Sequence, residues 1–181
     1  MIDEIMEYNR KFVENKGYEP YLTSKYPDKK LAILTCMDTR LLELLPAALG
    51  IKNGDAKIIK NAGGVIVHPY GSVVRSLLVG ILELGVEEVM VIGHTDCGVQ
   101  GMDGSEMLDM LVERGIDQQH IDIVRHSGID LERWLGGFES VESSVHETVR
   151  RLKEHPLMPK DVRISGFIMD SATGELTRVE G

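Results

Sequence analysis

Four short apolar runs, separated by stretches of helical spacing, constrain the fold of this chain more than any other feature. Each run ends at turn-forming or polar residues, as expected of a buried strand, and the runs cover residues 31–35, 57–59, 88–93 and 162–169. The apolar residues between them fit helices over residues 2–16, 41–49, 73–84 and 140–154. Strands that alternate with helices are typical of an α/β fold with right-handed crossovers. We therefore predict a central, mostly parallel sheet of about four strands, flanked by helices and preceded by an N-terminal helical arm.

The chain is long enough for one domain with a sizeable core, and we predict a single domain over residues 1–181. It divides into an N-terminal arm, a core, an excursion, and a closing helix and strand, over residues 1–30, 31–100, 101–138 and 139–181. The excursion is polar and interrupted by glycines, has helical spacing only over residues 105–114, and is expected to run over the body. A turn over residues 170–174 favours a short hairpin that ends near Val179.

The charge balance argues against two classes of partner. The chain has 20 Lys and Arg against 29 Asp and Glu, a net charge of −9, so its average field repels nucleic acid and anionic membranes. The first twelve residues form an acidic amphipathic pattern without the basic start and apolar stretch of a secretion signal. Uncharged apolar runs also stay shorter than a membrane span. We therefore expect a cytoplasmic protein with no nucleic-acid or membrane partner.

Polar side chains follow three of the predicted strands at the point where each strand ends. Cys36, Asn61 and His94 all occupy such positions. Ligand sites in open α/β sheets lie in the crevice at the carboxyl ends of the strands. We therefore expect these three residues to converge on one crevice.

The two cysteines of the chain, together with one histidine, form a candidate metal site. Cys36 ends the first strand, and His94 precedes Cys97 by three residues, a spacing that suits two ligands from one loop. Two thiolates and an imidazole suit tetrahedral zinc, and three protein ligands leave a fourth position open, as in catalytic sites. Two alternatives stay open at this point: buried, inert thiols, or a redox or regulatory protein in which Cys36 and Cys97 form a reversible disulfide.

Asp38 and Arg40 lie two and four residues after Cys36, where the strand gives way to a helix start. A guanidinium that forms a bidentate ion pair with a carboxylate would keep this carboxylate ionised and fix its orientation. Such a carboxylate can accept a hydrogen bond from a zinc-bound hydroxide. Two other roles are possible for Asp38: an N-cap that accepts backbone amides, or a fourth zinc ligand if Arg40 releases it.

Three motifs in this order resemble the β-class carbonic anhydrases: C-M-D-T-R at residues 36–40, K-N-A-G-G at 60–64 and G-H-T-D-C-G at 93–98. The resemblance is strong over residues 31–98, and the shorter bacterial and archaeal branch fits best. It implies one zinc ion per chain on Cys36, His94 and Cys97, and an Asp38–Arg40 catalytic dyad. It further implies substrate-binding positions at Gly64 and Gly98, the latter supplying a backbone donor. A homodimer or larger homo-oligomer is also implied, with the N-terminal helix lying on a neighbouring subunit.

The activity that this resemblance implies is the reversible hydration of carbon dioxide to bicarbonate by a zinc-bound hydroxide. The chain departs from the better-known pattern at Lys60, where relatives carry arginine, and at Lys52, in a segment where many relatives supply a glutamine that binds substrate. Hydrolysis of carbonyl sulfide or carbon disulfide by a related zinc enzyme is therefore the alternative.

Overall fold

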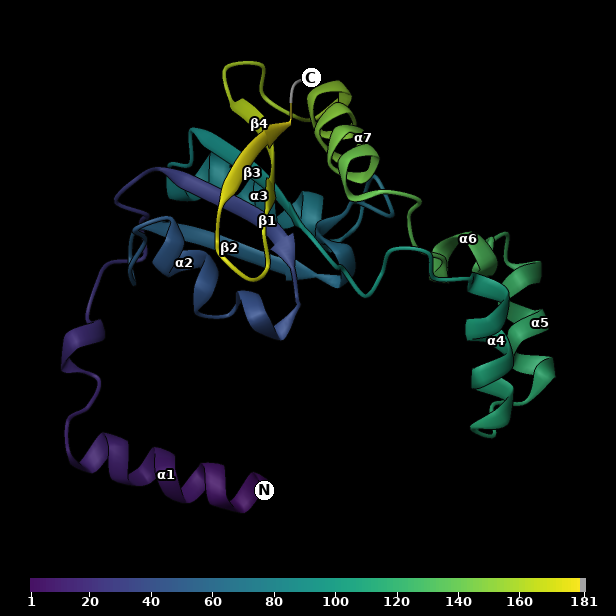
Figure 1. Cartoon of the computed structure of the whole chain (residues 1–181), viewed down its shortest axis with the longest axis horizontal. Helices are drawn as coiled ribbons and strands as arrows, with labels where there is room; N and C mark the ends of the chain where they lie inside the picture. Colours follow the sequence, from purple (N-terminus) through teal and green to yellow (C-terminus); the bar gives the residue numbers. More distant parts are fainter. Residues whose placement is uncertain (180–181) are drawn as a thin grey trace.

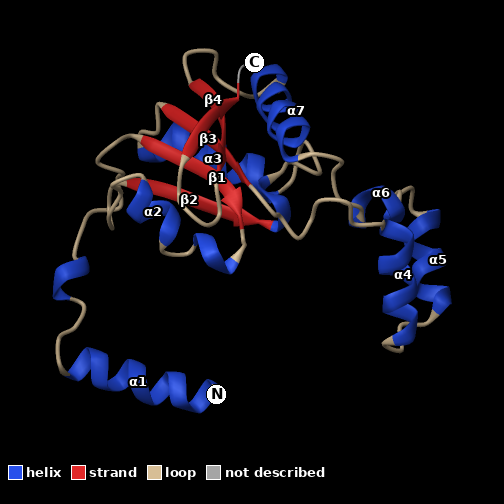
Figure 2. Ribbon diagram, viewed as in Figure 1, coloured by secondary structure: helices blue, strands red, loops and turns tan. Residues whose placement is uncertain are grey.

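A five-stranded sheet forms the centre of the computed structural model, which describes residues 1–179 (Figures 1 and 2). The strand order is β2-β1-β3-β4-β5. The first four of these pair in parallel, and the last is antiparallel to its neighbour. The strands are β1 (Leu31–Cys36), β2 (Ala56–Asn61), β3 (Glu88–His94), β4 (Arg163–Met169) and β5 (Leu176–Val179).

The mostly parallel sheet confirms the predicted fold class, with one strand more than the four expected. The extra strand, β5, is the second arm of the hairpin predicted after residue 170. Its turn is closed by Asp170, whose side chain accepts hydrogen bonds from the backbone amides of Ala172 and Thr173. The side chains of β5 are half-buried or exposed, and its sequence, L-T-R-V, lacks the continuous apolar run of a strand that is buried on both faces.

Seven α-helices accompany the sheet within the described residues. They are α1 (Ile2–Glu14), α2 (Leu44–Ala48), α3 (Ser72–Leu84), α4 (Gly104–Glu113), α5 (Gln118–His126), α6 (Leu131–Leu135) and α7 (Val141–Glu154). None of them is both long enough and apolar enough to cross a membrane. Short 3₁₀ turns follow β1 and β2, at Thr39–Leu41 and Ala62–Gly64. These two turns lie at the carboxyl edge of the sheet, where the candidate site was predicted.

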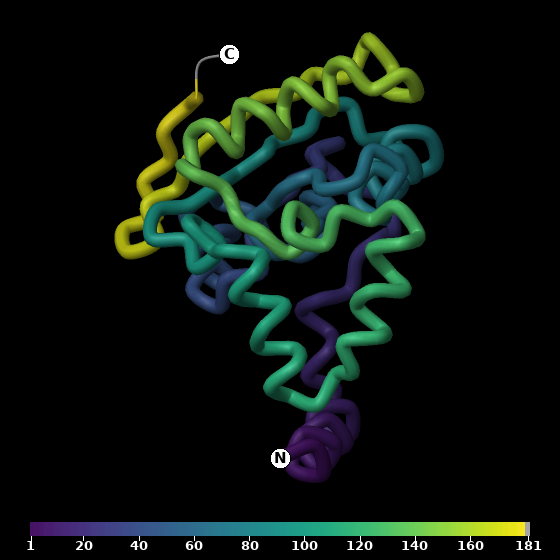
Figure 3. Tube along the Cα trace, turned by 90° about the vertical axis from the view of Figure 1, so that its right-hand side faces the viewer, coloured from purple at the N-terminus to yellow at the C-terminus, as the bar shows by residue number. Residues whose placement is uncertain are grey.

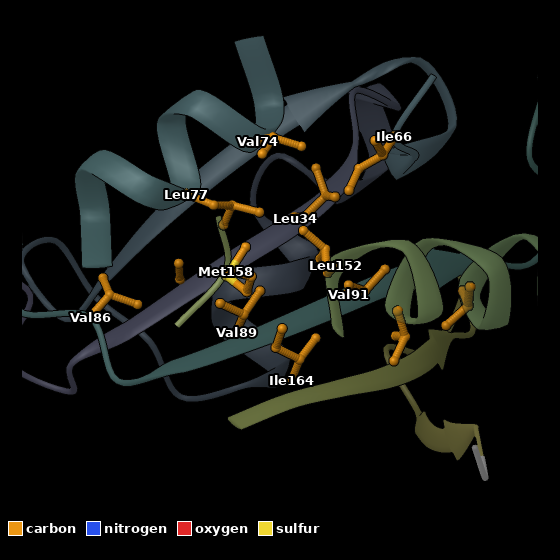
Figure 4. Close-up of a cluster of buried hydrophobic side chains, with 13 residues drawn as sticks. Leu34, Ile66, Val74, Leu77, Val86, Val89, Val91, Leu152, Met158 and Ile164 are labelled. Atoms are coloured by element: carbon orange, nitrogen blue, oxygen red, sulfur yellow. The ribbon is translucent and has the colours of Figure 1, made fainter. Parts of the chain in front are cut away.

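The sheet is buried on both faces, because successive residues of its central strands point into different clusters. On one face, Leu34 and Val91 pack with Leu77 of α3 and Leu152 of α7 (Figure 4). On the other face, Ile33 and Ile92 pack with residues of α2 and of the 3₁₀ turn before it. Continuous apolar runs are what strands covered on both faces require. The second cluster also contains both cysteines, so the hydrophobic core extends to the candidate site.

The N-terminal arm stands away from the rest of the chain. Helix α1 has no buried residue, and its apolar side chains face solvent: Ile2 is 76%, Ile5 61% and Met6 62% exposed. Figures 1 and 3 show α1 at the end of an extended connection, separated from the sheet. An amphipathic helix gains most of its stability from packing its apolar face. Among the described residues, nothing covers the exposed side chains Ile2, Ile5 and Met6 of α1.

The sequence led us to expect that the excursion over residues 101–138 runs over the body. The structure does not confirm this expectation. It forms α4, α5 and α6, which project from the body at the end opposite α1 in Figure 1 and extend below the sheet, as α1 does, in Figure 3. The reason is a small core of its own: Leu108, Ile121 and Leu131 are buried against one another. The apolar residues that would have attached the segment to the sheet are used within it.

Candidate metal centre

The ends of β1 and β3, together with the loop after β3, bring Cys36, His94 and Cys97 together. All three are buried. The two Sγ atoms lie 3.9 Å apart, and one donor atom from each residue lies within 4.8 Å of the other two. Within residues 1–179, no other group of three His, Cys, Asp or Glu side chains converges in this way. The convergence arises from the register, because parallel pairing sets the ends of β1 and β3 side by side.

The ring of His94 is oriented by a single hydrogen bond. Its Nδ1 donates to the carbonyl oxygen of Thr95 over 2.9 Å, which leaves Nε2 with a free lone pair. Nε2 is buried and is the one buried side-chain nitrogen or oxygen in the described chain without a hydrogen-bond partner. A buried polar atom without a partner is costly unless something else binds it. A metal ion is the partner that fits an imidazole lone pair beside two thiols.

The two thiols differ in acidity. Burial raises the pKa of the Cys36 thiol, but the adjacent His94 ring and the backbone amides of Asp38 and Gly63 outweigh this effect and lower the pKa to about 7. Burial raises the pKa of Cys97, and the charge of Cys36 raises it further. Cys36 is therefore ready to ionise near neutral pH, and a divalent cation would favour the second thiolate. The donor set fits zinc, which prefers sulfur and imidazole ligands.

Asp38 and Arg40 form a bidentate ion pair beside these residues. Arg40 Nε donates to Asp38 Oδ1 over 3.0 Å, and Arg40 Nη2 donates to Oδ2 over 2.9 Å. The guanidinium lowers the pKa of the Asp38 carboxyl to about 2, although partial burial opposes this shift. The carboxylate is thereby ionised at any ordinary pH. Asp38 Oδ2 lies 3.9 Å from His94 Nε2, so one carboxylate edge faces the candidate metal position.

The N-cap role that competed with this pairing in the sequence is also present. Asp38 Oδ1 accepts the backbone amide of Arg40 over 2.9 Å and caps the turn Thr39–Leu41. One carboxylate therefore serves both roles, because Oδ1 accepts both the capping amide and Arg40 Nε while Oδ2 accepts Arg40 Nη2. In this structure Asp38 is paired with Arg40 rather than grouped with the three candidate ligands.

The two glycines predicted at the substrate position differ in their surroundings. Gly64 has φ +66°, and a methyl group placed on it would lie 3.0 Å from the backbone nitrogen of Cys36. The turn Ala62–Gly64 can therefore lie against the end of β1 only without a side chain here. At Gly98 a methyl group would meet no atom within 4 Å, so this backbone borders open space.

Asn61 ends β2 at the same edge, but its side chain serves its own turn. Its Nδ2 donates to the carbonyl of Val65 over 2.7 Å, and its Oδ1 accepts the amide of Val65 over 3.1 Å. Of the three strand-end residues, only Cys36 and His94 therefore belong to the candidate metal centre.

Two polar residues that the sequence did not single out complete the surroundings of the site. Asp96 binds Arg40 through both its carboxylate and its carbonyl, each over 2.8 Å. Ser171, in the β4–β5 turn, donates its amide to Thr95 Oγ1 over 3.0 Å. Asp96 lies inside the H-T-D-C motif, which could have drawn attention to it. Ser171 is distant from the three motifs in the sequence, and no sequence pattern indicated that it lies near the site.

A large groove lies beside the centre. It has a volume of about 1510 Å³ and is lined by apolar side chains of residues 62–69 and of α4, α5 and α6, and by polar and charged side chains along α7. Val99 and Phe138 line it as well, and they also pack against the cluster that holds both cysteines. The groove and the candidate metal centre therefore share one wall.

The chain is similar to a known family of proteins both in sequence and in structure. Residues 31–176 match the family described as carbonic anhydrase. A Bacillus subtilis protein named "Putative carbonic anhydrase YvdA" is 51% identical over 175 residues, which cover 97% of this chain and 89% of that protein. The crystal structure of β-carbonic anhydrase isoform I from Trichomonas vaginalis superposes with a TM-score of 0.88 at 34% identity, covering 99% of this chain and 97% of that one.

A relative with another activity is also similar. A carbon disulfide hydrolase of Acidithiobacillus thiooxidans is 31% identical over 158 residues, covering 82% of this chain and 76% of the relative. Both activities that the motifs implied are therefore represented among similar proteins.

Proposed function

The chain belongs to the β-class carbonic anhydrase family, and from this premise we propose that it interconverts carbon dioxide and bicarbonate with one zinc ion held by Cys36, His94 and Cys97. The observation that carries the proposal is the buried, unpartnered Nε2 of His94 within 4.8 Å of donor atoms from two cysteines. When bound at such a site, zinc acidifies water and so supplies a nucleophile for carbon dioxide near neutral pH.

The contribution of Asp38 follows from its charge state. Because Arg40 keeps the carboxylate ionised, Asp38 can only accept hydrogen bonds. Oδ2, which faces the candidate ligands, would accept a hydrogen bond from the attacking water species and fix the direction of its reactive lone pair. In the reverse direction the same oxygen would accept from the hydroxyl of bicarbonate and repel its charged oxygens, so that one orientation of the substrate is favoured.

The remaining groups hold this arrangement in place. Thr95 keeps the His94 proton on Nδ1, so that Nε2 stays available as a ligand. Arg40 neutralises the charge of Asp38. Gly98, whose backbone borders open space, is the position from which an amide would donate to a substrate oxygen.

Stopped-flow hydration of carbon dioxide on protein of known zinc content tests the proposal. We expect about one zinc per chain and hydration that is faster at about pH 8.5 than at about pH 7, because two thiolates offset the charge of zinc and leave its water less acidic than in all-histidine sites. Cys97→Ser should lose zinc and activity together. Asp38→Asn should keep zinc and lose activity, which separates the metal site from the dyad. Wild-type protein with zinc but without hydration would refute the proposed reaction.

Carbon disulfide hydrolysis is the second candidate, favoured by the similarity to the Acidithiobacillus thiooxidans hydrolase. The same zinc-loaded protein should release little hydrogen sulfide from carbon disulfide if the first proposal holds. Rapid sulfide release together with slow carbon dioxide hydration would reverse the assignment.

We also propose that the protein is a homodimer in which α1 of one copy occupies the groove of the other. Helix α1 has no buried residue and exposes Ile2, Ile5 and Met6, while apolar residues of α5 and α6 line the groove. Helix α1 and the segment that carries α5 lie at opposite ends of the molecule in Figure 1, and both extend below the sheet in Figure 3. A second copy would cover both surfaces at once in a symmetric pair.

The oligomeric state measured by light scattering tests the dimer. Ile5→Asp places a charge in the exposed apolar stripe and should yield monomers. Lys11→Glu changes a charge at a polar position of the same helix and should leave the dimer intact. A monomeric wild-type protein, or a dimer that tolerates Ile5→Asp, would exclude this mode of assembly.

A further inference from the structure

Arg40 is held on two edges, and only one of them belongs to the proposed dyad. Its Nε and Nη2 bind the Asp38 carboxylate. On the opposite edge, Nη1 donates to Asp96 Oδ2 and Nη2 donates to the Asp96 carbonyl, each over 2.8 Å. Four of the five guanidinium N–H groups therefore have protein acceptors in a planar, forked arrangement that fixes the group.

The backbone of Asp96 is unusual in a way that makes this second edge possible. Its φ is +53°, a left-handed conformation that the described residues show at only two other non-glycine positions, Lys16 and Lys30. Aspartate is among the few side chains that adopt it at low cost. In this conformation the carbonyl and the carboxylate of one residue both reach the same guanidinium. Since Asp96 lies between His94 and Cys97, the loop that carries two candidate ligands is tied to Arg40.

We propose that Asp96 is a positioning residue that keeps Arg40 on Asp38, an inference that rests on the proposed carbon dioxide hydration. Asp38 Oδ2 lies only 3.9 Å from His94 Nε2, so a carboxylate that Arg40 released would be near enough to turn toward the metal position. The Asp96 carboxylate is 85% exposed, and an exposed ion pair adds little to stability. Its effect is therefore on the orientation of Arg40, not on folding.

Two substitutions tolerate the left-handed backbone and differ only in the acceptor. Asp96→Gly removes the side-chain acceptor, whereas Asp96→Asn keeps a neutral one. The zinc-loaded wild-type protein should show separate NMR signals for the Nη protons of Arg40, because its guanidinium cannot rotate. The signals that disappear in Arg40→Lys are those of Arg40. We expect Asp96→Gly to merge these signals and to lower kcat about fivefold or more, and Asp96→Asn to retain both within about twofold.

The proposal is overturned if Asp96→Gly keeps the separate signals and the wild-type kcat, or if Asp96→Asn falls as far as Asp96→Gly. Loss of zinc from Asp96→Gly would also overturn it, since the residue would then support the ligand loop instead of Arg40. The NMR comparison does not depend on turnover. If the wild-type protein fails to hydrate carbon dioxide, the proposed function fails, while the Arg40 signals still decide the role of Asp96.

Discussion

Replacing Gly64 with alanine tests whether the turn after β2 positions the first candidate ligand. Gly64 has φ +66°, and the added methyl group would lie 3.0 Å from the Cys36 nitrogen and 3.0 Å from the Thr35 carbonyl carbon. Both are backbone atoms of a central strand that pairs with neighbours on both sides, so they cannot move aside as a flexible side chain would.

The expected cost has two parts. Alanine in a left-handed conformation costs about 1–2 kcal/mol relative to glycine, and overpacking against fixed atoms adds about 1–3 kcal/mol. Gly50→Ala is the matched control, because Gly50 has φ +63° and a methyl group there would meet nothing within 4 Å. Gly50→Ala therefore has the cost of the left-handed conformation but no overpacking. Alanine lowers the conformational entropy of the unfolded chain equally in both variants, so this effect cancels in the comparison.

Denaturant unfolding of zinc-loaded protein should therefore place Gly64→Ala about 1–3 kcal/mol below Gly50→Ala. In a domain of this size, each kcal/mol corresponds to about 2–4 °C in Tm. Zinc affinity, measured against a competing chelator, should fall about tenfold or more in Gly64→Ala only, because the displaced strand end carries Cys36. Equal stability of the two variants within about 0.5 kcal/mol, with equal zinc affinity, would refute the claim that this contact shapes the site.

Three further predictions concern the dyad and the metal. Arg40→Ala should keep zinc but lose at least about tenfold in carbon dioxide hydration, since Asp38 loses both guanidinium donors; full activity by stopped flow would remove the dyad from the mechanism. Asp38 has a folded-state pKa of about 2, below its ordinary 3.8, so its stabilising contribution is complete above about pH 4 and is lost as the pH falls toward 2. The stability difference between wild type and Asp38→Asn in urea should therefore shrink over this range, and a constant difference would contradict the pairing. Removing zinc with a chelator should abolish hydration and lower Tm, and added zinc, but not magnesium, should restore both.

The sheet and the convergence of ligands could be predicted because both depend on strands that are buried on both faces. Such strands are continuous apolar runs, and the residue that follows each run must lie at one edge of a parallel sheet. That reasoning placed Cys36 and His94 together without knowledge of any loop. Burial did not mark β5, whose residues are half-buried or exposed; the turn over residues 170–174 predicted this strand instead, as the second arm of a hairpin.

Within the excursion, the helix predicted over residues 105–114 is confirmed by α4, but α5 and α6 were not predicted, because these two helices have little to bury. Helix α5 has one buried residue, Ile121, and α6 is five residues long with Leu131 as its one buried residue. Their starts do have a local signal, since Asp117 and Asp130 each accept a backbone amide of the turn that follows. Capping residues indicate where a helix begins but not what it packs against. The spacing of the apolar residues therefore did not predict where the excursion lies relative to the sheet.

The surroundings of His94 show why the finer parts of the site lie beyond sequence reasoning. Thr95 accepts the Nδ1 proton of His94 through its carbonyl, while its own amide donates to the carbonyl of Met169 and its hydroxyl accepts the amide of Ser171. These two residues belong to the end of β4 and the turn after it, more than 70 positions along the chain. The hydrogen bond that orients the His94 ring thus comes from a residue that is itself held by β4, the strand paired with β3, and by the turn after it. A metal ion bound at Nε2 of His94 would therefore depend on contacts from β4 and the turn after it, although every candidate ligand lies in the first 97 residues.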